Sequence, residues 1–145
     1  MIAEWYLAKL VMKITVAGDP RSVVHQNLTL IRASSPVEAY EKALTFGKAG
    51  EVSYDNPNGK AVQICFEGIS DLTEIYDNLE DGSELAFTET VGMPEEQIRT
   101  LILPRNRLTA FLPPRPTDGP DYRSGEVIAK VERMINRSEG NAPEN

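Results

Sequence analysis

The sequence contains one cysteine, one histidine and one tryptophan in 145 residues, and it has no long apolar run. A single thiol, Cys65, excludes an intramolecular disulfide, and no charged segment followed by an apolar run marks a signal peptide, so we expect a cytoplasmic location. Apolar stretches such as 10–12 and 100–103 are far shorter than the roughly 18 residues of a membrane-spanning helix. We therefore expect a soluble protein without a membrane partner.

The scarcity of histidine and cysteine also limits the chemistry that the chain can carry. One His and one Cys supply neither a closed zinc site nor a paired-histidine motif, so we expect no metal and no cofactor. The chain has no Gly-x-Ser-x-Gly motif, and His25 has no nucleophile or orienting carboxylate at a motif spacing. Catalysis stays open, but the sequence favours a protein that is not an enzyme.

Lys and Arg are absent from residues 67–96, which contain ten carboxylates and a net charge of −10. The flanking residues 1–66 and 97–145 have net charges of +1 and +2, which together give the total of −7. Binding to a phosphate backbone needs clustered cations, and this chain concentrates the opposite charge. The composition therefore argues against a nucleic-acid partner.

Apolar residues at every even position from Tyr6 to Val16 predict a strand with one buried face. A second strand is predicted over 25–33, and the two are expected to pair antiparallel. Ser35 is a predicted helix N-cap, followed by Pro36 and by Glu38 at the capping-box position. The expected buried stripe of this helix is Val37, Tyr40, Ala43, Leu44 and Gly47, with a C-cap in 47–50.

Three further strands are predicted, over 52–55, 61–69 and 84–91, the first two joined by an Asn58-Gly59 hairpin turn. The order is strand, strand, helix, strand, strand, strand. This pattern predicts an α+β domain over residues 1–91, an antiparallel sheet of about five strands with one amphipathic helix on one face.

Residues 92–145 are predicted to be a C-terminal extension, because prolines interrupt the regular patterns seen in residues 1–91. A short helix is expected from Pro94 to Leu103, followed by an arm that five prolines interrupt. A second short helix is expected over 124–136, before a polar, disordered tail at 138–145.

The face of the sheet opposite the helix is the candidate binding surface. The odd positions of the first strand place Trp5, Leu7 and Lys9 there, and the strand over 61–69 places Cys65, Glu67 and Ile69 there. A half-apolar sheet face is commonly covered by a second protomer or by another segment. We expect Lys9 and Glu67 to meet across neighbouring strands on this face. Scattered exposed apolar residues are, however, ordinary on protein surfaces.

Glu89 is the candidate inward carboxylate, because it shares its phase with Leu85, Phe87 and Val91. A carboxylate pointing into a core has a raised pKa and often marks a site. The alternative is that the strand ends near Thr88, which leaves Glu89 in solvent.

Several short motifs occur together in the first part of the chain. They are Trp5-Tyr6-Leu7-Ala8-Lys9-Leu10, the helix at 35–47, Ser53-Tyr54 before the Asn58-Gly59 turn, Phe66-Glu67-Gly68-Ile69 with Asp71-Leu72, and 79–84. Together they resemble a bacterial family catalogued as domain of unknown function 4288. The resemblance covers residues 4–90 and implies a small bacterial cytosolic domain without an established activity.

Three functions compete at this point. The leading hypothesis is an interaction module that binds a protein partner or forms a homo-oligomer through the second sheet face. The alternative is a small-ligand-binding or enzymatic domain that uses Glu89. The third is nucleic-acid binding by the arginines of the arm, Arg99, Arg105, Arg107, Arg115 and Arg123, which could equally pair with the carboxylates of residues 67–96.

Overall fold

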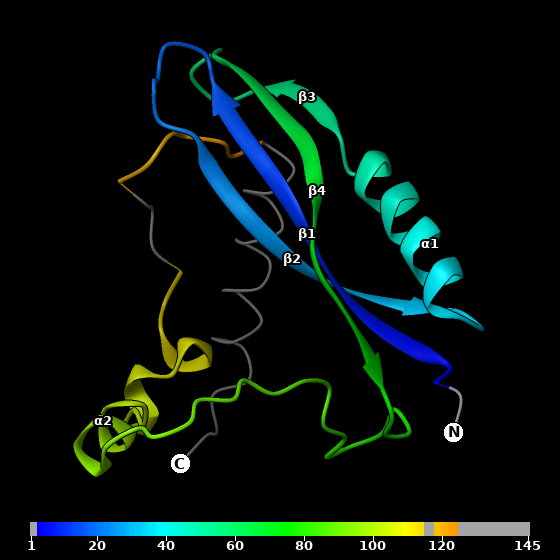
Figure 1. The fold of residues 1–145 in the computed structure, drawn as a ribbon. Helices are drawn as coiled ribbons and strands as arrows, with labels where there is room; N and C mark the ends of the chain where they lie inside the picture. Colours follow the sequence, from blue (N-terminus) through cyan, green and yellow to red (C-terminus); the bar gives the residue numbers. More distant parts are fainter. Residues whose placement is uncertain (1–2, 115–117, 125–145) are drawn as a thin grey trace, which may run out of the picture. The chain divides into compact units, whose positions relative to one another are not determined.

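The computed structural model describes residues 3–114 and 118–124. Residues 3–86 together with 118–124 form one compact unit, and residues 87–114 form another. The first unit contains an antiparallel sheet with the strand order β2-β1-β4-β3 and one helix, α1 (Figure 1). The elements are β1 (Trp5–Val16), β2 (Val23–Arg32), α1 (Pro36–Ala49), β3 (Val52–Asp55) and β4 (Ala61–Ile75). The predicted α+β class is confirmed.

The sheet has four strands within the described residues, so the prediction of a fifth over 84–91 is wrong. Residues 84–90 have no regular secondary structure. Leu85 and Phe87 share one phase of this segment, but both side chains are exposed. Alternation produces a strand only where one phase is buried, and here neither phase is.

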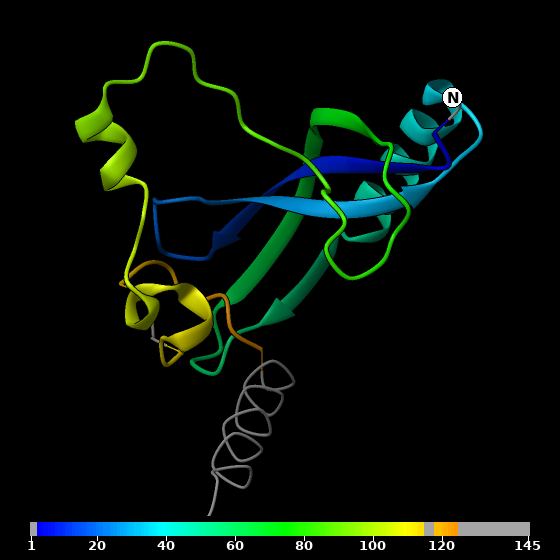
Figure 2. The same ribbon diagram turned by 90° about the horizontal axis from the view of Figure 1, so that it is seen from below.

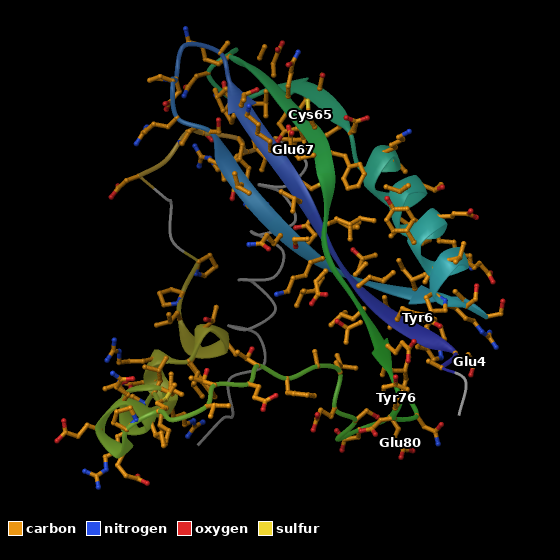
Figure 3. The ribbon with its side chains drawn as sticks, in the orientation of Figure 1. Glu4, Tyr6, Cys65, Glu67, Tyr76 and Glu80 are labelled. Atoms are coloured by element: carbon orange, nitrogen blue, oxygen red, sulfur yellow. The ribbon has the colours of Figure 1, made fainter. Side chains whose placement is uncertain are left out.

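β1 is one of the two inner strands of the sheet, and its side chains separate cleanly between the two faces. The even positions from Tyr6 to Val16 are all buried, as the sequence pattern predicts. Tyr6 lies on the side of β1 that faces α1 (Figure 3). Figures 1 and 2 show α1 beside the half of the sheet that contains the start of β1. One core cluster therefore forms under the helix.

Helix α1 begins as predicted and buries part of the predicted stripe, Ala43 and Gly47, together with Ala39. The Ser35 hydroxyl accepts a hydrogen bond from the Glu38 N–H at 3.2 Å, and the Glu38 carboxylate accepts one from the Ser34 N–H at 3.0 Å. The buried helix residues are Ala39, Ala43 and Gly47, whereas Val37 and Tyr40 are exposed. Small side chains every four residues allow the helix to lie close to the sheet.

The closest approach of helix to sheet is at Gly47. A β-carbon placed there would lie 2.4 Å from the ring of Phe66 on β4. Gly47 is therefore an internal packing residue, and the helix continues to Ala49 before Gly50 caps it. The C-cap predicted within 47–50 is confirmed only at its last residue.

β4 extends beyond the predicted 61–69 because its pairing with β1 continues to Ile75, and two irregularities interrupt that pairing. Register shifts fall between Lys9 and Leu10 and between Val11 and Met12. Each shift leaves one extra residue on β4, Ser70 and Glu67 respectively. The inward positions of β4 are consequently spaced by three residues at each bulge, which places Ile69 opposite Leu10 on the core side.

The β3–β4 hairpin closes through residues 56–60, and Asn58-Gly59 lies within this loop. The Asn56 carbonyl accepts from the Gly59 N–H at 2.9 Å, and Gly59 has a φ of 75°, which suits glycine. The Asn56 side-chain oxygen also accepts from the N–H groups of Asn58 and Lys60. The hairpin is confirmed, but the predicted two-residue turn is wrong.

Residues 118–124, which we call the return segment, pack against the end of the sheet away from α1. Tyr122 contacts the cluster of Ile14, Val16 and Val62, and its ring meets His25 edge-on at 5.4 Å. The Tyr54 hydroxyl donates to the Tyr122 carbonyl, and the Asn56 amide donates to the Asp121 carbonyl at 2.9 Å. Burial is the main cause that raises the pKa of the Tyr54 phenol, and electrostatic interactions with Tyr122 and Asp121 raise it further. A second core cluster forms there.

The unit of residues 87–114 contains α2 (Glu95–Thr100) and two 3-10 turns, η1 (Arg105–Arg107) and η2 (Thr109–Phe111). The predicted short helix is present but shorter than 94–103, because Pro104 fixes an extended backbone soon after it. No residue of these three elements is buried, and the Arg105 guanidinium lies 4.9 Å from the Phe111 ring centre. The helix predicted over 124–136 lies almost wholly outside the described residues.

Candidate functional site

The sheet face opposite α1, which we call the outward face, carries both apolar and charged side chains. On β1 it carries Leu7 and Val11, and the register places β2 residues directly beside the outward side chains of β1. Leu30 pairs with Leu7, Leu28 with Lys9 and Val24 with Lys13. Val24, Leu28 and Leu30 are 58%, 62% and 45% exposed. Three large aliphatic side chains on one edge strand therefore face solvent.

Trp5 lies at one end of the outward face and is only half-exposed. The Arg32 guanidinium sits 5.6 Å from the centre of its ring and also pairs with the carboxylate of Glu4. A cation over an indole ring is attracted to its negative face. Trp5 is thus partly covered within its own chain, and the apolar centre of the face lies on Leu7, Leu28 and Leu30.

The predicted pairing of Lys9 with Glu67 is wrong. The residue opposite Lys9 on β4 is Asp71, and Glu67 is the extra residue of the bulge near Val11. No ion pair within the described residues joins Lys9 to Glu67. Glu67 lies with Cys65 on the same part of β4 (Figure 3) and is exposed. A bulge moves the register by one residue, which period-two counting along β4 cannot detect.

Glu89 is exposed and belongs to a segment without regular structure. The hypothesis of an inward carboxylate at this position is therefore wrong. Its basis was the fifth strand, which the chain does not form.

Two tyrosines, Tyr6 of β1 and Tyr76 just after β4, lie near the end of β4 (Figure 3). The Tyr76 hydroxyl donates to the Glu74 carboxylate, and this hydrogen bond raises the pKa of Tyr76. Burial is the main cause that raises the pKa of the Tyr6 phenol, and the nearby carboxylates of Glu74 and Glu38 raise it further. Raised values keep both phenols protonated at neutral pH, so neither tyrosine supplies a general base.

The largest aliphatic residues of the outward face, on β2, were missed by the sequence reasoning. The signal was present in Val24, Leu28 and Leu30, which share one phase of the strand. The other phase contains His25, Asn27 and Thr29. The sequence of β2 by itself would predict that its more apolar phase faces the helix. The pairing with β1 shows that this phase faces away from the helix.

The fold and this face define a small α+β domain, one antiparallel sheet with a helix on one side and an apolar face on the other. The family model described as "Domain of unknown function (DUF4288)" matches residues 5–87, and the chain belongs to that family. This confirms the resemblance drawn from the sequence motifs. No curated protein and no solved structure matches the chain.

Residues 3–114 and 118–124 contain no group of three or more His, Cys, Asp or Glu side chains placed to hold a metal ion. None of the helices in this part of the chain has the length and apolar character needed to cross a bilayer.

Proposed function

We propose that this chain is a protein-interaction module that forms a homodimer through its outward face. The observation that carries the proposal is the exposure of Val24, Leu28 and Leu30 in the outward phase of β2, where Leu28 and Leu30 lie beside Leu7. Exposed apolar patches are uncommon on soluble monomers and mark interaction sites when they are contiguous. Within the described residues of this unit, α1 covers one side of the sheet, and a half-apolar second side is commonly covered by another protein.

The charges on the outward face favour a second copy as the partner. Lys9 and Lys13 project from β1, and Asp71 projects from β4 opposite Lys9. A two-fold dimer buries the same patch on both copies, so the patch must be complementary to itself. A face that carries both signs of charge around an apolar centre satisfies this condition.

The test replaces Leu28 with Lys and measures the mass in solution by light scattering, between about 1 and 100 μM chain. We expect the unchanged chain to approach twice 16.1 kDa and the Leu28→Lys variant to stay at 16.1 kDa. The matched control is Val37→Lys, because Val37 is 68% exposed on the helix and lies on the other side of the sheet. This control should dimerise like the unchanged chain.

A monomeric mass for the unchanged chain throughout this range would overturn the homodimer. Dimerisation that Leu28→Lys leaves intact would move the interface away from the outward face. We also propose a cytoplasmic location, supported by the single thiol Cys65, and cell fractionation would test it.

A further inference from the structure

A cleft on the inward face of the sheet, the side that α1 covers, has the composition of a small-molecule site. Helix α1 covers the Tyr6–Leu10 half of β1, and Tyr122 of the return segment packs near Ile14 and Val16. Between these two covers lies a cavity of about 300 Å³. Its volume is at the lower end of the range for ligand pockets. The cavity involves none of the outward residues, so it is independent of the proposed dimer.

Apolar groups form the floor and one wall of this cleft. Leu10, Met12 and Ile14 of β1 line it, together with Ile64 of β4. Phe46 and Gly50, at the C-terminal end of α1, also line it. These groups suit the flat apolar body of a small ring, because an aromatic ring buries a large area against aliphatic and aromatic neighbours.

Polar side chains line the cleft from β2. His25, Asn27 and Thr29 occupy alternate positions of this strand, and all three contribute to the lining. They are opposite Met12, Leu10 and Ala8 in the pairing register, so they share the inward phase. Each of the three residue types carries both hydrogen-bond donors and acceptors. A ligand that matches this row needs a donor and an acceptor side by side, as in a carboxamide.

No Lys, Arg, Asp or Glu side chain lines the cleft. The wall formed by α1 is its C-terminal end, where the helix dipole is negative. Both facts disfavour an anion such as a phosphate or carboxylate. The return segment holds one end of the cleft in place, because Tyr122 contacts His25 and its carbonyl accepts from Tyr54.

We propose that this cleft binds a small uncharged ring compound that carries a carboxamide-like polar edge. Benzamide is the probe, and benzoate is the charged comparison of nearly the same shape. A two-dimensional amide NMR titration of the full chain follows both compounds. We expect saturable shifts with benzamide, centred on the amides of 25–29 and Gly50, and at least tenfold weaker binding of benzoate.

Two variants and one control place the ligand in the cleft. Asn27→Leu removes the middle polar group from an exposed position and should weaken benzamide binding at least fivefold. Gly50→Leu should abolish binding by filling the cleft, because a β-carbon at Gly50 would lie 3.3 Å from the Met12 methyl. Ala49→Leu, an exposed change one residue earlier, should leave binding unchanged.

Equal binding of benzoate and benzamide would overturn the proposal, as would shifts that do not saturate. Benzamide shifts that Asn27→Leu leaves unaltered would also overturn it, and this variant keeps the test decisive should Gly50→Leu unfold the chain. Loss of dimerisation by Leu28→Lys with benzamide binding retained would show that the two surfaces act separately.

Discussion

The two phases of β2 place opposite kinds of residue on the two faces of the sheet. The inward phase carries His25, Asn27 and Thr29 before the buried Ile31, whereas the outward phase carries Leu28 and Leu30 in solvent. The strand thus directs its polar row toward the side of the helix and its aliphatic row away from it. Apolar content within one strand therefore does not decide which phase is buried, because the neighbouring strand fixes the register.

Substitution of two adjacent residues on β2 tests this comparison with the largest expected effect. Ile31 is fully buried, so Ile31→Ala should lower the free energy of unfolding by about 2–5 kcal/mol. Leu30→Ala removes a similar volume from an exposed position and should change it by less than about 0.5 kcal/mol. Urea denaturation at low chain concentration measures both. Equal losses for the two variants would contradict the assignment of the faces.

The close contact of α1 with the inward face gives the next largest effect. Gly47→Ala places a methyl group 2.4 Å from the Phe66 ring, so the ring or the helix must shift. We expect a net loss of about 1–2 kcal/mol, because overpacking outweighs the better helix propensity of alanine. Urea denaturation measures the loss, and Phe66→Leu in the same chain should recover part of it. A Gly47→Ala variant more stable than the unchanged chain would show that the helix stands off the sheet.

The start of α1 gives the smallest effect, which depends on pH. Hydrogen bonds from the Ser34 hydroxyl and N–H, with Lys42 nearby, lower the pKa of the Glu38 carboxyl. A carboxyl whose pKa is lowered by folding adds stability above its ordinary pKa and loses it as the pH falls toward the folded value. Urea denaturation of the unchanged chain and Glu38→Gln from about pH 7 to pH 3 measures this.

We expect the stability difference between these two chains to shrink as the pH falls through the carboxyl range. A difference that stays constant with pH would show that Glu38 acts through shape and not through its charge. Ser35→Ala serves as the comparison, since the Ser35 hydroxyl caps the same turn without a titrating group.

Local patterns were sufficient for the elements that neighbours in sequence control. The buried phase of β1, the start of α1 at Pro36 and the Asn58-Gly59 hairpin all follow from residues within a few positions of each other. The strand expected over 84–91 does not form, although Leu85 and Phe87 lie two residues apart as in a strand with one apolar face. A strand also needs a partner edge and a surface to cover its apolar phase, and neither requirement is written in the segment itself.

The candidate surface was predicted in part. The side opposite the helix was correctly expected to carry Leu7 and Lys9 on β1. The position of Glu67 depends on a bulge, and the position of Ile69 depends on the same irregular register. Gly68 has a φ of 150°, a conformation that favours glycine, so the glycine was the one local sign of the irregularity.

The sequence by itself determined the α+β class, the first strand with its buried even positions, and the concentration of carboxylates in 67–96. These depend on periodicity and composition, which are properties of the chain alone. The tertiary structure decided which phase of β2 is exposed, why Gly47 must lack a side chain, and that Tyr122 returns to the sheet. These depend on contacts between residues far apart in the chain, and packing against a distant neighbour has no local signal.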